Sequence, residues 1–150
     1  MSTVGITATK DHLYLTLTSS NREEFQILQS HRIAIDSANW PTMLANIKTH
    51  LDSYNAHDPV SGIGLVGCAS GKYGASPEAF KAEGLAELQC QADNYPITRV
   101  TKQSLKKRLE CQDGQTWQQA AKNLFNNDKS IKHFSFGFDA AISGAYASLP

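Results

Sequence analysis

Asp139 is the acidic residue whose setting in the sequence most strongly suggests chemistry. It lies near the start of residues 136–149, a segment of apolar and small residues that we expect to form the last helix. A carboxylate in a first helical turn is stabilised by the positive end of the helix dipole, and small residues let a helix lie close to a sheet. Asp139 can therefore act as an anionic ligand at a site or as an ordinary helix cap.

Positive charge is concentrated in residues 97–110, which form the only dense basic cluster of the sequence. Lys102 and Lys106 share one face if this segment is helical. Phosphate groups are natural partners for such a cluster, although a solvated helix face gives the same pattern. A lysine in the glycine-flanked turn at residues 71–74 can also reach an anion, because glycine allows close backbone approach. The residues that we predict to contact nucleic acid are Lys72, Lys102, Lys106, Lys107 and Arg108.

Length and composition limit the classes of protein to which the chain can belong. Its 150 residues suit a single domain, which we expect to cover residues 1–150. The formal net charge is zero, so any binding of nucleic acid has to be local. The three cysteines are far apart and fit neither a disulfide framework nor a metal knuckle, and no apolar run is long enough to cross a membrane. We therefore expect a cytoplasmic protein without membrane contact.

The hydrophobic pattern changes period along the chain. Extended segments with alternating or continuous apolar residues are expected at residues 3–9, 13–19, 25–35, 62–68 and 97–100. Helical spacing of apolar residues is expected at residues 40–54, 77–91, 101–109, 117–125 and 136–149. In the helix at residues 77–91, the large apolar positions are Phe80, Leu85 and Leu88. The predicted order of elements is therefore β-β-β-α-β-α-β-α-α-α.

This order predicts an α/β fold. Three successive strands with short connections favour an antiparallel meander, whereas two later strands separated by helices require parallel crossovers. The result is a mixed five-stranded sheet with helices on both faces.

The same order, with an Asp at the start of the final helix, resembles the ribonuclease H-like fold and, within it, the branch of Holliday-junction-resolvase-like proteins. The resemblance is strongest from Tyr95 onward. The matching segments are residues 101–107, 113–115, 118–120 and 139–145. Residues 71–85 also resemble a small uncharacterised bacterial family of this fold.

The resemblance implies a metal site of defined composition. Enzymes of this fold hold two divalent ions roughly 4 Å apart between carboxylates of the first strand, a central element and the last helix. In this sequence, the first-strand position is Thr7 and the second position of the final-helix motif is Ile142. The remaining acidic candidates are Asp139 and Glu83. One or two carboxylates bind Mg²⁺ or Mn²⁺ only weakly unless substrate phosphates complete the coordination shell.

These residues predict a degenerate nuclease-like domain that associates with nucleic acid and has weak or no phosphodiester cleavage. One alternative is a divergent Mg²⁺-dependent nuclease in which Glu83 and Asp139 are the catalytic residues and metal ligands. Another alternative is a non-catalytic protein-interaction domain. A homo-oligomer fits the zero net charge, because near-neutral proteins associate more readily.

Overall fold

The elements of the chain follow the predicted order. The computed structural model describes residues 1–67, 76–125 and 138–149. In chain order, the elements are β1 (Ser2–Ala8), β2 (His12–Ser19), β3 (Ile27–Ala34), α1 (Trp40–His57), β4 (Val60–Val66), α2 (Pro77–Ala92), β5 (Ile97–Val100), α3 (Lys102–Arg108), α4 (Trp117–Phe125) and α5 (Phe138–Ala147). The turn predicted at residues 71–74 lies outside the described residues.

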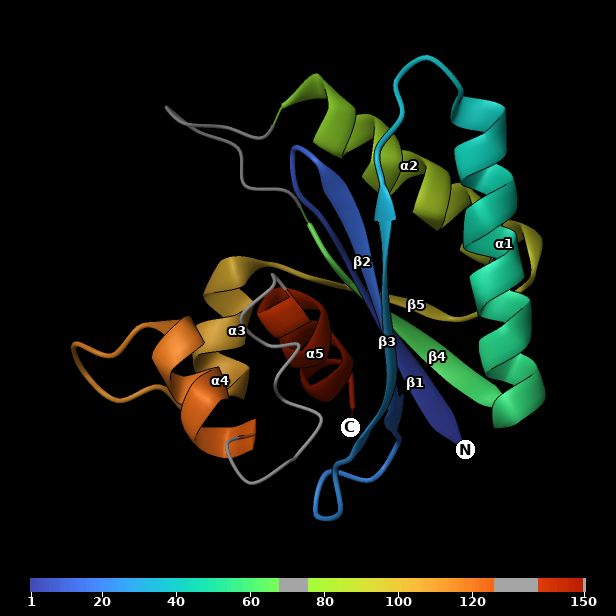
Figure 1. Ribbon diagram of the computed structural model, residues 1–150. Helices are drawn as coiled ribbons and strands as arrows, with labels where there is room; N and C mark the ends of the chain where they lie inside the picture. Colours follow the sequence, from blue (N-terminus) through green and yellow to red (C-terminus); the bar gives the residue numbers. More distant parts are fainter. Residues whose placement is uncertain (68–75, 126–137, 150) are drawn as a thin grey trace.

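The strands form one mixed sheet in the order β3-β2-β1-β4-β5 (Figure 1). The pairs β1–β2 and β2–β3 are antiparallel, whereas β1–β4 and β4–β5 are parallel. This arrangement confirms the predicted five-stranded sheet with an antiparallel meander and two parallel strands. It also makes β1 the central strand, in contact with elements from both halves of the sequence.

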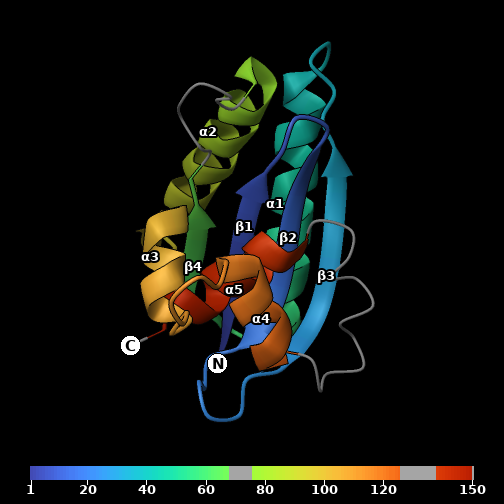
Figure 2. The ribbon, with the colours of Figure 1, turned by 90° about the vertical axis from the view of Figure 1, so that its left-hand side faces the viewer.

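Helices cover both faces of the sheet, as predicted (Figure 2). Side chains alternate along each strand, so successive residues of β2 enter different clusters. Leu13, Leu15 and Leu17 pack with residues of α1 and α2, whereas Tyr14 packs with residues of α3, α4 and α5. The two clusters together bury both surfaces of the central strands.

The helices on the first face begin at capped residues and bury different kinds of side chain. Asn39 caps α1 by accepting a hydrogen bond from the Thr42 backbone N–H at 3.2 Å, and Ser76 caps α2 by accepting one from Ala79 at 3.2 Å. The buried stripe of α1 is Met43, Ile47, Leu51 and Tyr54. The inner face of α2 is formed largely by small residues, and Phe80 and Leu88 point outward. Small inner side chains allow α2 to lie close to the sheet.

Within the residues that the structure describes, none of the helices has the length and apolar character that crossing a membrane requires.

Candidate functional site

The last helix lies directly against the central strand, although more than a hundred residues separate them in sequence. A Cβ atom placed on Gly5 of β1 would lie only 1.8 Å from the carbonyl oxygen of Ala141 in α5. On the neighbouring strand, a Cβ on Gly64 would lie 2.2 Å from the carbonyl oxygen of Gly144. Only glycine permits such close contact between a helix backbone and a strand backbone. The predicted juxtaposition of the first strand and the final helix is thus confirmed.

Thr7 lies on this α5 side of β1. Side chains alternate along a strand, so Thr7 shares a face with Gly5, two residues earlier. Its neighbours in the sheet register are Tyr14 on β2 and Val66 on β4, and its side chain is only 5% exposed. A neutral, buried hydroxyl therefore occupies the position where the resemblance implies a carboxylate.

Ile142 is a packing residue of α5. Its side chain is 1% exposed and belongs to the cluster that contains Tyr14 and Val66. It fills the space between the helix and the strands that flank β1. An alkyl side chain offers no oxygen to a metal ion, so this position contributes stability instead of coordination.

Asp139 is the second residue of α5. Its backbone lies two residues before Ala141, the residue whose carbonyl oxygen contacts Gly5. The first turn of α5 is therefore held beside β1. The side chain of Asp139 lies outside the described part of the structure, and its catalytic and metal-binding roles stay predictions.

Glu83 lies on α2, which packs on the opposite face of the sheet from α5 (Figures 1 and 2). Its side chain is buried and accepts a hydrogen bond from Nη1 of Arg99 on β5 at 2.9 Å. Arg99 also binds the carboxylate of Glu87. The hydrogen bonds that Arg99 donates, to Glu87 first and then to Glu83, raise the pKa of its guanidinium. The structure therefore does not bring Glu83 to the face that carries Thr7 and Ile142.

Residues 102–108 of the basic segment form α3. Leu105 and Leu109 are buried and anchor the segment, and the Thr101 hydroxyl caps it by accepting from the Ser104 backbone N–H at 3.1 Å. The exposed cations are Lys106, Lys107 and Arg108. In the part of the chain that the structure describes, none of these three cations takes part in an ion pair. Lys72 and the side chain of Lys102 lie outside the described residues.

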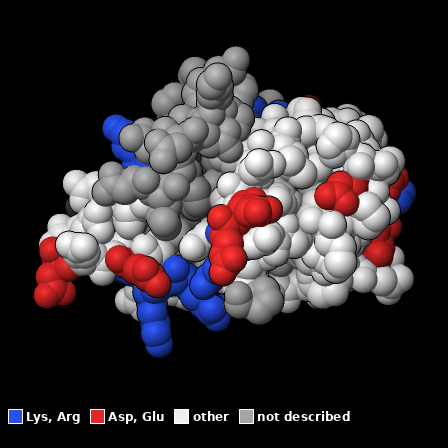
Figure 3. Space-filling model, turned by 90° about the horizontal axis from the view of Figure 1, so that it is seen from below, with Lys and Arg blue, Asp and Glu red and all other residues white. Residues whose placement is uncertain are grey.

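Positive charge on this part of the molecule is local. Figure 3 shows Lys and Arg side chains projecting at the lower edge of the view, with acidic side chains close by. This agrees with a formal net charge of zero. Attraction of phosphate to this surface would therefore act over short distances.

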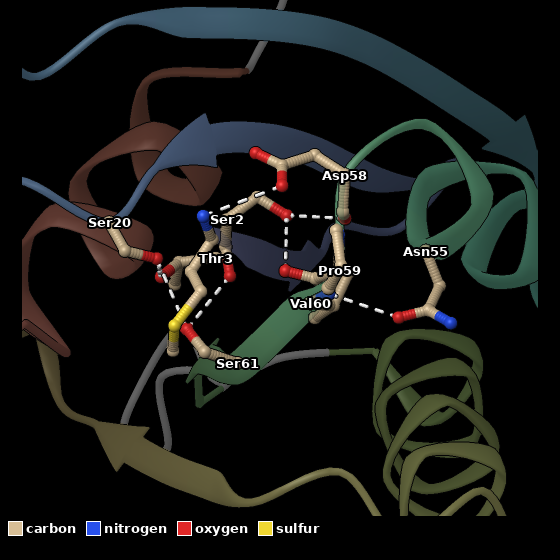
Figure 4. A network of polar contacts seen from close by, with 9 residues as sticks. Ser2, Thr3, Ser20, Asn55, Asp58, Pro59, Val60 and Ser61 are labelled. Atoms are coloured by element: carbon tan, nitrogen blue, oxygen red, sulfur yellow. Dashed lines mark hydrogen bonds and ion pairs between the residues drawn. The ribbon is translucent and has the colours of Figure 1, made fainter.

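A polar network holds the amino ends of β1 and β4 together (Figure 4). The Ser2 hydroxyl donates to the carbonyl oxygen of Asp58 at 2.9 Å, and the Ser61 hydroxyl donates to that of Ser2 at 2.9 Å. The Ser20 hydroxyl lies 2.8 Å from that of Thr3 and 3.1 Å from that of Ser61. These bonds fix the register of the parallel pair at one end of the sheet. Thr7 lies at the other end, where β1 finishes.

Thr7 and Ile142, two of the positions where the resemblance implies metal ligands, do not fit a two-metal centre. Among the described residues, no group of three or more His, Cys, Asp or Glu side chains lies close enough to hold a metal ion. Thr7 supplies a hydroxyl and Ile142 an alkyl group where hard carboxylate oxygens would be needed. Hydroxyls such as those of Thr7 and Tyr14 can hydrogen-bond to a phosphate oxygen but cannot replace the charge of two carboxylates.

Two residues of this region, Tyr14 and Arg99, are not among the site residues predicted from the sequence. The position of Tyr14 follows from the sequence, because the alternation of Leu13, Leu15 and Leu17 places it on the opposite face of β2 from these leucines. That face is the one on which α5 packs. The binding of Arg99 to the acidic residues of α2 had no sequence signal, because it depends on how β5 is placed beside the helix. Arg99 is thereby removed from the set of cations available to a phosphate.

No protein-family model matches the sequence, and no curated protein matches it. Solved structures do match. Thermus thermophilus RuvC gives a TM-score of 0.71 at 11% identity, covering 97% of this chain and 94% of that chain. T. thermophilus RuvC in complex with a Holliday junction substrate gives 0.65 at 12% identity, covering 97% and 93%. The yeast mitochondrial Holliday junction resolvase Ydc2 gives 0.62 at 11% identity, covering 97% and 74%.

These matches show the fold. The chain has the mixed sheet and the helices of the ribonuclease H-like Holliday junction resolvases, which confirms the resemblance found in the sequence.

Proposed function

We propose that the chain is a degenerate nuclease-like domain that associates with nucleic acid and cleaves phosphodiester bonds weakly or not at all. The observation that carries this proposal is Thr7. It lies on the central strand beside α5, where the resemblance implies a metal-ligating carboxylate, and it is a buried hydroxyl. The packing of Ile142 between the same elements supports the same conclusion.

The exposed cations of α3 support the nucleic-acid part of the proposal. Lys106, Lys107 and Arg108 are held in solvent by a helix that is anchored through Leu105 and Leu109. Such cations neutralise phosphates and release counterions, which is the main source of sequence-independent affinity. One of the structures with this fold is bound to a Holliday junction, so branched DNA is the first substrate class to examine.

The alternative, a divergent nuclease that uses Glu83 and Asp139, has less support. Glu83 is bound by Arg99 across the sheet from α5. Its use as a ligand beside Asp139 would require that ion pair to break and the side chain to reach another face. Mg²⁺ or Mn²⁺ would then find at most one carboxylate of the implied set on α5, which gives weak binding without substrate phosphates.

The proposal is tested by measuring binding and cleavage on the same labelled substrates. A four-way DNA junction, duplex DNA, single-stranded DNA and single-stranded RNA are incubated with the protein in Mg²⁺ or Mn²⁺. We expect binding without cleavage above that of a buffer control, and the same result for Asp139→Asn. Robust cleavage that is lost in Asp139→Asn would contradict the degenerate site, and loss in Glu83→Gln as well would favour the alternative. Absence of binding to all four substrates would contradict the nucleic-acid role.

A further inference from the structure

Three polar side chains form a cross-strand row on the face of the sheet that carries α5. Thr7 of β1 is paired in register with Tyr14 of β2, and Tyr14 is paired with Arg32 of β3. Residues that are directly opposite in register point to the same face of a sheet. Ile33, the neighbour of Arg32 along the chain, packs in the cluster of α1 on the other face, which agrees with this assignment. Thr7, Tyr14 and Arg32 therefore share one face.

Exposure to solvent rises along this row from β1 to β3. Thr7 and Tyr14 are 5% and 7% exposed, whereas Arg32, on the strand at the end of the sheet order, is exposed. Neighbouring strands lie about 4.8 Å apart, so the backbone of Arg32 is roughly 10 Å from that of Thr7. The long side chain of Arg32 can therefore contact a group that binds beside Tyr14 from the solvent side.

His12 adds a second hydrogen-bond donor beside Tyr14. It lies two residues before Tyr14 on the same face of β2, and the ring centroids of the two side chains are 5.9 Å apart. Because His12 is paired with Ala34, His12 and Arg32 are diagonal neighbours, whose backbones are about 7–8 Å apart. In Figure 2 the turn between β1 and β2, which precedes His12, lies above α5. An imidazole and a guanidinium thus flank one phenol ring at the end of the sheet where β1 finishes.

The chemistry of these groups suits a phosphate. A guanidinium offers a planar fork of N–H donors and a permanent positive charge, and an imidazole offers a ring N–H. A carboxylate at position 7 would repel a phosphate unless a metal ion lay between them, whereas the hydroxyl of Thr7 carries no charge. Arg32 can therefore supply the positive charge that a bound metal ion supplies in a site built from carboxylates.

We propose that Arg32 and His12 bind a backbone phosphate of nucleic acid beside Tyr14, and that this contact needs no divalent metal ion. The inference rests on the proposed function and makes it specific, because it states how the end of β1 holds a phosphodiester. Helix α3, with its exposed cations, packs on the same face of the sheet. Two separate cationic positions on one face suit a long polyanion with regularly spaced phosphates better than a short acidic peptide.

The first test measures binding of labelled single-stranded and four-way-junction DNA by fluorescence anisotropy, in EDTA and in Mg²⁺ at constant ionic strength. The wild-type chain is expected to bind in both buffers. Arg32→Gln should weaken binding by about tenfold in both, because a charge-assisted contact is lost. Arg32→Lys should lose less, since it keeps the charge without the planar fork. Lys48→Gln is the matched control, because it removes one positive charge from α1, on the opposite face of the sheet.

The outcomes of this test separate the inference from the proposed function. Wild-type binding that Arg32→Gln leaves unchanged would overturn the inference alone, as would wild-type binding that disappears in EDTA. Absence of DNA binding by the wild-type chain would instead contradict the proposed function, and the inference would fail with it. Poly-glutamate that displaces the DNA as well as unlabelled DNA does would overturn the assignment to a phosphate.

The second test locates the contact by NMR. The backbone amide resonances of His12, Tyr14 and Arg32 should shift when a short DNA oligonucleotide is added in EDTA. An uncharged methylphosphonate oligonucleotide of the same base sequence should leave them in place, because it lacks the phosphate charge. In Arg32→Gln these shifts should be reduced, and thermal unfolding of the variant shows that it is folded. Equal shifts with both oligonucleotides, or shifts that Arg32→Gln does not reduce, would overturn the proposal.

Discussion

Arg99 is the residue that pairs with the buried carboxylate of Glu83. The Glu83 side chain is 7% exposed, whereas that of Arg99 is 52% exposed. The charge of Glu83 therefore depends on this contact for compensation, whereas water can solvate Arg99. A buried carboxylate that loses a charged partner keeps the cost of leaving water. The ion pair therefore stabilises the packing of α2 beside β5.

We predict that Arg99→Ala lowers the free energy of unfolding by about 1–3 kcal/mol, because buried Glu83 loses a charge-assisted hydrogen bond. Urea denaturation monitored by tryptophan fluorescence measures this change. Adding Glu83→Gln to Arg99→Ala should recover part of the loss by removing the buried charge. Glu87→Gln alone should cost less than about 1 kcal/mol, because both groups of that pair reach solvent. Equal losses for Arg99→Ala and Glu87→Gln would contradict this interpretation.

His50 lies in a polar cluster between α1 and β3. Its ring centroid is 4.7 Å from that of His31 on β3, and Nδ1 of His31 lies 2.7 Å from the Tyr54 hydroxyl on α1. Burial, and then the charge of His31, lower the pKa of His50 below its usual value. Burial also raises the pKa of the Tyr54 hydroxyl, which stays neutral at physiological pH.

We predict that the protein loses stability as the pH falls below about 6.5. Because the folded state lowers the pKa of His50, the unfolded chain binds the proton more tightly. The contribution is therefore complete above the unfolded pKa and is lost as the pH falls toward the folded pKa. Thermal unfolding at a series of pH values measures the slope. His50→Asn should flatten it. An unchanged slope in His50→Asn would argue against this role.

At the scale of elements, the contact between α5 and the sheet depends on glycines. Gly5 and Gly64 are paired across β1 and β4, and both face the α5 backbone. A methyl group at either position would overlap a helix carbonyl oxygen. Since the helix backbone cannot move without losing the buried cluster around Ile142, the strain cannot be relieved locally.

Gly5→Ala and Gly64→Ala should each lower the free energy of unfolding by about 1–3 kcal/mol or more, the typical cost of overpacking. Gly62→Ala is the matched control, because a Cβ on this glycine of β4 would meet its nearest atom at an ordinary 3.6 Å. Denaturant unfolding of the three variants measures the difference. A loss in Gly62→Ala as large as in Gly5→Ala would show that strand glycines, and not the helix contact, are responsible.

At the scale of the whole molecule, zero net charge determines how nucleic acid can be bound. The chain carries 14 basic and 14 acidic residues, so no long-range field attracts phosphate. Affinity has to come from a few exposed cations near the substrate, and Lys106 and Lys107 are the best placed on the described surface. Such binding weakens steeply as salt is raised.

Lys106→Gln and Lys107→Gln should each weaken binding to duplex and branched DNA and reduce the slope of log affinity against log salt by about 0.9 per lost phosphate contact. Fluorescence anisotropy at several salt concentrations measures both quantities. Lys48→Gln is the control, since it removes the same charge from α1, where Lys48 is paired with Asp52 and Asp93 at 3.3 Å. Equal effects of all three substitutions would indicate a net-charge effect without a local site.

The sequence by itself determined the order of the elements and the faces of the strands. The alternation of Leu13, Leu15 and Leu17 with polar residues depends on neighbours along the chain, so the pattern is readable without coordinates. The chemical nature of Thr7 and Ile142 is equally a property of the sequence. The resemblance, together with these two residues, was enough to predict a resolvase-like fold that lacks carboxylates at two expected positions.

Only the tertiary structure decided which segments contact one another and which side chains face solvent. The contact of α5 with Gly5 joins segments that are far apart in the chain. The binding of Glu83 by Arg99 depends on how β5 lies beside α2, and the outward position of Phe80 depends on which face of α2 packs on the sheet. The helical spacing of α2 allowed either its large or its small residues to face the sheet. Close packing selected the small ones, because only they let the helix backbone approach the strands, and that choice left Phe80 and Leu88 in solvent.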